Sequence, residues 1–332
     1  MPIVADPISH VNVWPIDDEL LVTWRGGSED VSVFVSDSPV DAGTNVSAPD
    51  GPGRVSVERT RRAYIHLFDP DDGFTVAAQR VLPFETVRNF RDIGGYPTMD
   101  GAATRWGQVF RSGRLDELTD ADHDHLRELG ITRVFDLRTQ GEVDNEPDRL
   151  PDDIAYEHMP MSSSVAIPKG LLERISDGDV TSYTKDDMAA GYLRMLEMLP
   201  HYLNTMVAAV AAGEKILFHC TAGKDRTGIT AMTMLGIAEV ADAHVLDDYE
   251  VSAQYQPEGR VEFFTEEIRG MGIDPEPFDL HAMLGSPRPV MKKTLYGLRE
   301  RWQDHSGYHA HLGLTDDTIA AARANLRFEQ PG

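Results

Sequence analysis

The single cysteine of the chain lies in a short segment that also contains charged residues able to take part in catalysis. Cys220 is followed six positions later by Arg226, with glycines between and after them. A short apolar run ends at His219, and a helical pattern begins at Thr227. This order of strand, tight loop and helix turns backbone N–H groups inward at the positive end of the helix dipole. We therefore expect an anion-binding loop that holds a thiol.

The residue types of this loop match the steps of phosphoryl transfer. Inward amides and a nearby cation lower the pKa of a thiol, and the thiolate is the nucleophilic form. Arginine offers two parallel N–H groups to two phosphate oxygens. We predict Cys220 as the nucleophile, Arg226 as the group that stabilises the transferred phosphoryl group, and Asp225 as the acid that protonates the leaving oxygen. Asp136, at the end of another predicted strand, stays open as the alternative acid.

The remaining loop residues are predicted to bind phosphate or to support the loop. The phosphate-binding residues are Thr221, Ala222, Gly223 and Lys224, together with Arg226. His219 is expected to orient the loop, and the Thr227 hydroxyl to donate to the thiolate or to assist its departure from the phosphoenzyme. Arginine and backbone amides supply the positive charge that magnesium supplies in other phosphoryl-transfer sites. No metal and no cofactor is therefore predicted.

Residues 219–228 resemble the active-site signature of the bacterial tyrosine-protein phosphatases with atypical dual and lipid specificity. Other motifs of that family are similar to residues 89–96, 109–113, 135–138 with Glu142, 247–249 with Ser252, and 307–308 followed by 312–314. The resemblance covers roughly residues 84–326. It implies a phosphatase fold, catalysis through a phosphocysteine, and activity on phosphotyrosine and in some members on phosphoserine, phosphothreonine or phosphoinositides. An aspartate that serves as acid in a relative has no counterpart in residues 158–163, so we assign that role to Asp225.

Residues outside the loop are expected to support it. For Asp136 and Arg138 we favour an ion pair that braces the loop over direct chemistry. Asn89, Arg91 and Asp92 are expected to shape the pocket wall from beneath rather than to contact substrate.

Two regions of different character follow one another along the chain. Strand-like runs separated by Gly, Pro and Asp turns fill residues 1–82 and predict a small β-sandwich-like domain. After Pro83 the pattern alternates between strands and helices, which predicts a domain of the α/β class over residues 83–332. The resemblance implies that this is the catalytic domain, a cysteine-phosphatase fold with a central, mostly parallel sheet flanked by helices.

Composition excludes several classes of protein. The 332 residues include 31 Lys and Arg against 55 Asp and Glu, a formal net charge of −24. The electrostatic field of this negative charge repels nucleic acid and anionic bilayers, so no nucleic-acid binding is expected. The chain has no apolar stretch long enough for stable membrane insertion and no basic, apolar leader at its start, which favours a cytoplasmic protein. A salt-adapted protein and an ordinary acidic enzyme fit the charge equally well.

Three functions remain open at this level. The first is a hydrolase that removes phosphate from phosphotyrosine, with phosphoserine and phosphothreonine as further substrates of the same kind. The second is a phosphoinositide phosphatase, which Lys224 favours by offering a contact to a second phosphate and which the acidic charge opposes. The third is a non-catalytic module that only binds phosphate, against which the intact Cys220, Asp225 and Arg226 argue. The predicted partners are accordingly phosphorylated proteins or peptides, or phosphoinositides.

Overall fold

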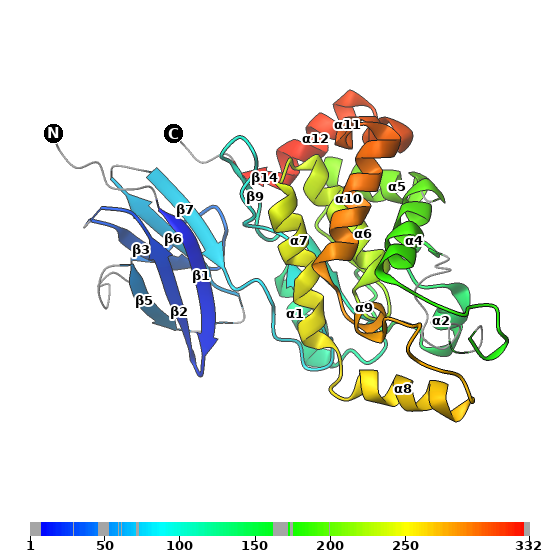
Figure 1. The fold of residues 1–332 in the computed structure, drawn as a ribbon. Helices are drawn as coiled ribbons and strands as arrows, with labels where there is room; N and C mark the ends of the chain where they lie inside the picture. Colours follow the sequence, from blue (N-terminus) through cyan, green and yellow to red (C-terminus); the bar gives the residue numbers. More distant parts are fainter. Residues whose placement is uncertain are drawn as a thin grey trace.

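Strands fill the first part of the chain, and strands alternating with helices fill the rest (Figure 1). The computed structural model describes residues 8–28, 30–45, 53–58, 60, 62–70, 73–161, 172, 175–198 and 200–328. No helix in these described ranges has the length and apolar character that crossing a bilayer requires.

Two antiparallel sheets, here called the N-terminal sheets, form the first part. One has the order β1-β2-β5 and the other β4-β3-β6-β7. Their strands are β1 (Ser9–Ile16), β2 (Glu19–Arg25), β3 (Ser32–Ser36), β4 (Thr44–Asn45), β5 (Arg54–Glu58), β6 (Tyr64–Asp69) and β7 (Gly73–Ala78). Buried and less buried positions alternate along β2, as expected for a strand with one face on a core. Side chains of both sheets share one apolar cluster, which includes Leu20, Val22, Val33 and Ile65, so the sheets pack face to face as a small sandwich.

A five-stranded sheet forms the centre of the second part, in the order β12-β11-β13-β10-β8. Its strands are β8 (Arg91–Asp92), β10 (Val109–Ser112), β11 (Arg133–Asp136), β12 (Ala155–His158) and β13 (Ile216–His219). All neighbours run parallel except β8, which pairs antiparallel with β10. Every residue of β13 is buried, because helices cover both faces of a parallel sheet. The predicted α/β class with a central, mostly parallel sheet is confirmed.

Helices and short strands surround this sheet. They are β9 (Ala103–Thr104), α1 (Asp120–Glu128), α2 (Gln140–Asn145), α4 (Lys185–Met198), α5 (Pro200–Ala211), α6 (Asp225–Ile237), α7 (Asp242–Val251), the 3-10 helix η1 (Ser252–Tyr255), α8 (Arg260–Gly270), α9 (Leu280–Leu284), α10 (Arg288–Trp302), α11 (His305–His311), α12 (Asp316–Leu326) and β14 (Arg327–Phe328). Every residue of α6 is buried, and this helix lies at the centre of the helical layer (Figure 1). It begins two residues earlier than the helical pattern indicates, and its first turn therefore carries Asp225 and Arg226.

The central sheet separates two apolar clusters. Successive residues of a strand face opposite sides of a sheet. Accordingly, Leu217 of β13 packs in the cluster with Phe110 and Leu126, whereas Phe218 packs in the larger cluster with α5 and α6. Strand β13 is thus packed on both faces. This packing fixes its carboxyl end and therefore the position of Cys220, the next residue.

Candidate active site

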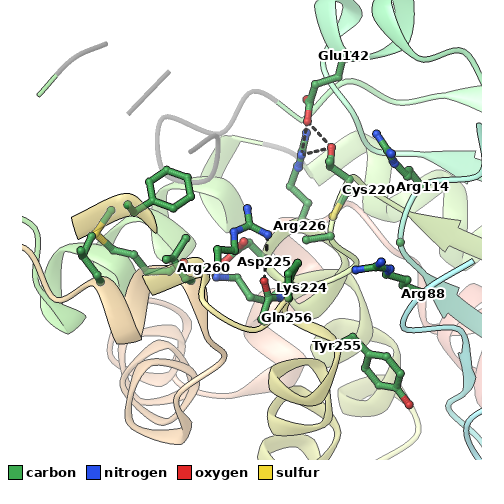
Figure 2. A pocket seen from close by; sticks show the side chains of 18 of the residues that line it. Arg88, Arg114, Glu142, Cys220, Lys224, Asp225, Arg226, Tyr255, Gln256 and Arg260 are labelled. Carbon is green, nitrogen blue, oxygen red and sulfur yellow. Dashed lines mark hydrogen bonds and ion pairs between the residues drawn. The ribbon is translucent and has the colours of Figure 1, made fainter. Parts of the chain in front are cut away.

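A cavity of about 410 Å³ opens where β10 and β13 end (Figure 2). Cys220, the residue directly after β13, lines it, as does Gly113, the residue directly after β10. Ligands of open parallel sheets bind at this carboxyl edge. The structure brings the predicted loop residues Cys220, Thr221, Ala222, Lys224, Asp225 and Arg226 to the wall of this one cavity.

The loop between β13 and α6 turns sharply at Gly223. This residue has a φ of +65°, in the left-handed region. A Cβ atom built on it would lie 2.4 Å from the backbone oxygen of Ser112 and 2.7 Å from the nitrogen of Gly113. Only glycine fits at this position, because the loop packs directly against the backbone that leaves β10.

The carbonyl groups of the loop are held by the surrounding scaffold. The Asn89 side-chain amide donates to the backbone oxygens of Ala222 and Gly223 at 3.0 Å each. The guanidinium of Arg111 also donates to Gly223 O, at 2.7 Å. In a trans peptide the N–H group points opposite to the C=O group. Carbonyls fixed toward the scaffold therefore turn the following N–H groups toward the interior of the loop, as an anion site requires.

The Cys220 side chain lies at the base of this loop. The residue is only 2% exposed, and the Thr227 hydroxyl donates to its Sγ at 3.1 Å. Burial alone raises the pKa of the thiol, but the charge of Arg226 and hydrogen bonds from Thr227 outweigh it, so the pKa falls below its ordinary value. The arrangement favours a thiolate at the N-terminus of α6, the positive end of the helix dipole.

Arg226 is held by a carboxylate on α2. Its Nη1 and Nη2 atoms each donate to an oxygen of Glu142 at 2.8 Å, a bidentate pair (Figure 2). Burial opposes the charge of Glu142, yet the bonds from Arg226 hold the pKa of that carboxyl well below its usual range. The Nε atom of Arg226 is buried and has no hydrogen-bond partner among the described residues. This pairing fixes the plane of the guanidinium and leaves one N–H free for a ligand.

Asp225 is held by a pair of buried tyrosines. The Tyr192 hydroxyl donates to Asp225 Oδ1, and the hydroxyls of Tyr192 and Tyr249 lie 2.8 Å apart. Burial and the charge of Asp225 raise the pKa values of both tyrosines well above normal, so both stay protonated donors. The carboxyl also lines the cavity. The hydrogen bond from Tyr192 therefore fixes the Asp225 carboxyl at the wall of the cavity.

Lys224 is engaged with protein atoms. Its Nζ atom donates to the backbone oxygen of Met283 at 2.5 Å and lies 3.4 Å from Asp225 Oδ1. Burial lowers the pKa of this ammonium group, and the charge of Asp225 opposes the effect. The predicted contact with a second phosphate would require the ammonium to leave these two partners.

A buried charge cluster lies behind the loop. Arg138 donates to Asp136 at 2.8 Å and to Asp148 at 2.7 Å, and His219 Nε2 lies 2.8 Å from Asp148 Oδ2. Burial lowers the pKa of His219, but the two carboxylates outweigh burial and raise it. Asp136, Asp148 and His219 are close enough to share a cation, and the guanidinium of Arg138 already contacts both carboxylates. Asp136 therefore forms the expected ion pair and is not among the residues that line the cavity.

A second buried network supports the loop from beneath. Asp248 of α7 accepts hydrogen bonds from Arg91 Nε, at 2.9 Å, and from Arg111 Nη1, at 2.5 Å. Burial raises the pKa of this carboxyl, but the two arginines hold it well below its usual range. Arg91 also donates to the side chain of Asn89, which binds the loop carbonyls. Asp92 instead turns away from the cavity and pairs with Arg62.

Sequence reasoning assigned no role to four residues that position the site. They are Arg111, Glu142, Tyr192 and Asp248. Three of them lie in segments that resemble family motifs, and Tyr192 lies at a position of an apolar helix pattern. The motifs were a signal for the importance of Arg111, Glu142 and Asp248, but pairing across 33 to 137 residues cannot be read from spacing.

The comparisons with known proteins agree with this geometry. A model of the family described as "Tyrosine phosphatase family" matches residues 82–328. The chain belongs to the tyrosine phosphatase family.

Three named proteins are similar in sequence to this chain. A putative tyrosine-protein phosphatase of Cupriavidus necator is 30% identical over 54% of this chain and 66% of that protein. A tyrosine-protein phosphatase of Nostoc commune is 30% identical over 65% of this chain and 73% of that protein. The triple specificity protein phosphatase PtpB of Mycobacterium tuberculosis is 32% identical over 72% of this chain and 96% of that protein.

Among solved structures, the core catalytic domain of a PP-IP phosphatase from S. cerevisiae aligns with 58% of this chain and 99% of that chain. The two are 17% identical, and the TM-score is 0.27.

The lowered pKa of Cys220 predicts the pH dependence of its alkylation. The thiolate persists until the pH falls through the lowered pKa, so inactivation by iodoacetamide should have a midpoint below about 8.5, the value of a free thiol. The same thiolate stabilises the fold above the unfolded-state pKa, and this contribution is lost as the pH falls through the folded-state pKa. Thr227→Val should raise the midpoint because it removes a hydrogen bond to the sulfur.

A matched control is Thr233→Val on the same helix, because the Thr233 hydroxyl bonds to the Ile229 carbonyl and not to the sulfur. A midpoint at or above that of a free thiol, unchanged in Thr227→Val, contradicts the assignment.

Proposed function

We propose that this chain hydrolyses phosphomonoesters, foremost phosphotyrosine in proteins, through a phosphocysteine intermediate on Cys220. One observation carries the proposal. Cys220, whose thiol has a lowered pKa, and Arg226, whose buried Nε has no hydrogen-bond partner among the described residues, line the same cavity. A loop with these donors matches a tetrahedral oxyanion bonded to the sulfur.

The proposed reaction has two steps. In the first, Sγ of Cys220 forms a bond to phosphorus while the bond from phosphorus to the ester oxygen breaks, and Asp225 gives its proton to that oxygen. In the second, water attacks the thiophosphate, Asp225 takes a proton from the water, and the thiolate leaves as phosphate is released. Arg226 and the loop amides stabilise the equatorial oxygens in both steps, and Thr227 stabilises the departing thiolate.

The shape of the cavity favours an aromatic phosphoester. Cys220 is almost fully buried at its base, so the phosphoryl group must be carried on an arm long enough to reach it. The apolar part of the cavity lining suits the ring of tyrosine; it comprises Leu172, Ile175, Phe264, Ile268, Leu280, Met283 and Leu284. The shorter arms of phosphoserine and phosphothreonine reach less deeply. The name of the mycobacterial relative, a triple specificity phosphatase, supports assaying them beside phosphotyrosine.

Two alternatives receive less support. A phosphoinositide phosphatase needs a cation for a second phosphate, and Lys224, the residue expected to supply it, is bound to Met283 O and Asp225 instead. A second phosphate would have to bind another cation of the cavity wall, Arg88, Arg114 or Arg260. A module that only binds phosphate needs neither a lowered thiol pKa nor a carboxyl held at the cavity wall.

The proposal is tested first by Cys220→Ser. The wild-type protein should release phosphate from para-nitrophenyl phosphate and from phosphotyrosine peptides in the presence of EDTA, and vanadate should inhibit it. The serine variant should lose about four orders of magnitude in kcat, because serine at neutral pH is a far weaker nucleophile. Circular dichroism and tungstate binding serve as controls for folding and for the anion site. Turnover that survives the substitution, or an absolute requirement for a divalent ion, contradicts the mechanism.

The role of Asp225 is tested by the leaving group. Asp225→Asn should lower kcat/KM, which reports the first step alone, about a hundredfold or more for phenyl phosphate, whose leaving oxygen needs a proton. It should lower kcat/KM little for dinitrophenyl phosphate, whose leaving group departs as an anion. Tyr192→Phe removes a hydrogen bond that holds this carboxyl in place, so it should lower kcat/KM for phenyl phosphate in the same direction and by a smaller factor.

Asp136→Asn is the comparison variant, because Asp136 is the alternative acid by sequence. The same dependence on leaving group in Asp136→Asn, and its absence in Asp225→Asn, would assign the acid role to Asp136.

A further inference from the structure

The N-terminal sheets contact the catalytic part of the chain through a small buried cluster. The family match begins at residue 82, so these sheets lie outside it. The cluster contains Tyr64 of β6, Ala78 of β7 and Trp106, and Val76 packs against it. The indole nitrogen of Trp106 donates to the Val76 carbonyl at 3.0 Å. The contact therefore combines apolar burial with a directional hydrogen bond.

Arg62 crosses this contact from the N-terminal sheets. Its guanidinium donates to the carboxylate of Asp92, and the two side chains are 9% and 0% exposed. It also lies 4.5 Å from the ring centre of Tyr64 and 5.5 Å from that of Trp106. A buried ion pair with satisfied geometry fixes the relative position of the groups that carry it, and removal of one partner leaves an uncompensated charge.

Arg80 follows β7 and is the second arginine that reaches from the N-terminal sheets to the catalytic part of the chain. Its Nη1 atom donates to the backbone oxygens of Asp92, at 3.1 Å, and Gly94, at 2.6 Å. Its guanidinium lies 3.7 Å from the ring centre of Tyr96, and the Tyr96 hydroxyl donates to Asp248 Oδ1 at 3.3 Å. Asp248 is the carboxylate that holds Arg91 and Arg111 beneath the loop. Arg80 is thus separated from the loop support by a single aromatic side chain.

Strand β8 connects the two sides. It consists of Arg91 and Asp92, and successive side chains of a strand point to opposite faces. Arg91 turns toward Asp248 and Asn89, which binds the loop carbonyls, whereas Asp92 turns toward Arg62. A displacement of Asp92 by the N-terminal sheets must therefore also move Arg91, which helps to hold the loop.

We propose that the N-terminal sheets brace the phosphate-binding loop and that Arg62 and Arg80 are positioning residues for the reaction. The proposal rests on the proposed function for its effect on turnover. Its effect on the titration of Cys220 does not depend on that function, because the positions of Arg226 and Thr227 around the sulfur set the thiol pKa whether or not the protein turns over substrate.

The test uses Arg62→Met and Arg80→Met in the full chain, with two readouts. Methionine keeps an unbranched stem and removes the guanidinium. We expect kcat on a phosphotyrosine peptide to fall about three- to thirtyfold, with less change in KM, as for coupling through a packed network. We also expect the midpoint of Cys220 alkylation to move to higher pH. Arg62→Lys keeps the charge and should restore part of both values.

Arg54→Met is the matched control. Arg54 is exposed on β5, in the other of the two N-terminal sheets, and its substitution should leave both readouts unchanged. If a methionine variant does not fold, Arg62→Lys and the remaining variant carry the test. Folded variants with wild-type kcat and wild-type titration overturn the proposal, even when their melting temperature falls. A wild-type protein without phosphatase activity refutes the proposed function, while a shifted titration midpoint in the variants still supports the brace.

Discussion

The direction of a few peptide groups between Cys220 and Arg226 determines what this site can do. Their carbonyls are held outward by Asn89 and Arg111, so their N–H groups face inward. An array of inward amides in front of a helix stabilises a thiolate and, later, the oxygens of a phosphoryl group. In the proposed reaction the same donors serve both states, so the loop must be rigid before substrate arrives.

Buried and partly buried charges provide that rigidity, and each is paired with a group of opposite charge. Asp248 binds two arginines beneath the loop, and Glu142 binds Arg226 above it. Isolated charges in these positions would cost several kcal/mol, and the loss of one partner costs about 3–5 kcal/mol. The networks therefore confine the loop and its arginine to one geometry. They also explain why a chain with a strongly negative net charge can hold an anion: the local field of the loop opposes the field of the whole protein.

The chemistry of this site is easier to predict from sequence than its supports. The spacing of Cys220 and Arg226 between an apolar strand and a helix is local information, and it predicts the loop. The mostly parallel sheet that carries the loop is implied by the resemblance to the phosphatase family. The partner of Arg226 is not local, because Glu142 comes from a different helix. The direction of Asp92 depends on Arg62 in the N-terminal sheets, and that of Lys224 on the Met283 carbonyl. Contacts between distant segments decide these cases, and no periodicity encodes them.

The central claim is that phosphate passes through the sulfur of Cys220. The most direct measurement is rapid acid quenching of the protein during turnover of a phosphotyrosine peptide, followed by peptide mass spectrometry. We expect one phosphoryl group on the peptide that contains Cys220, lost on treatment with iodine, which cleaves thiophosphates. Turnover with no such adduct, or a phosphoryl group on another residue, would contradict the account.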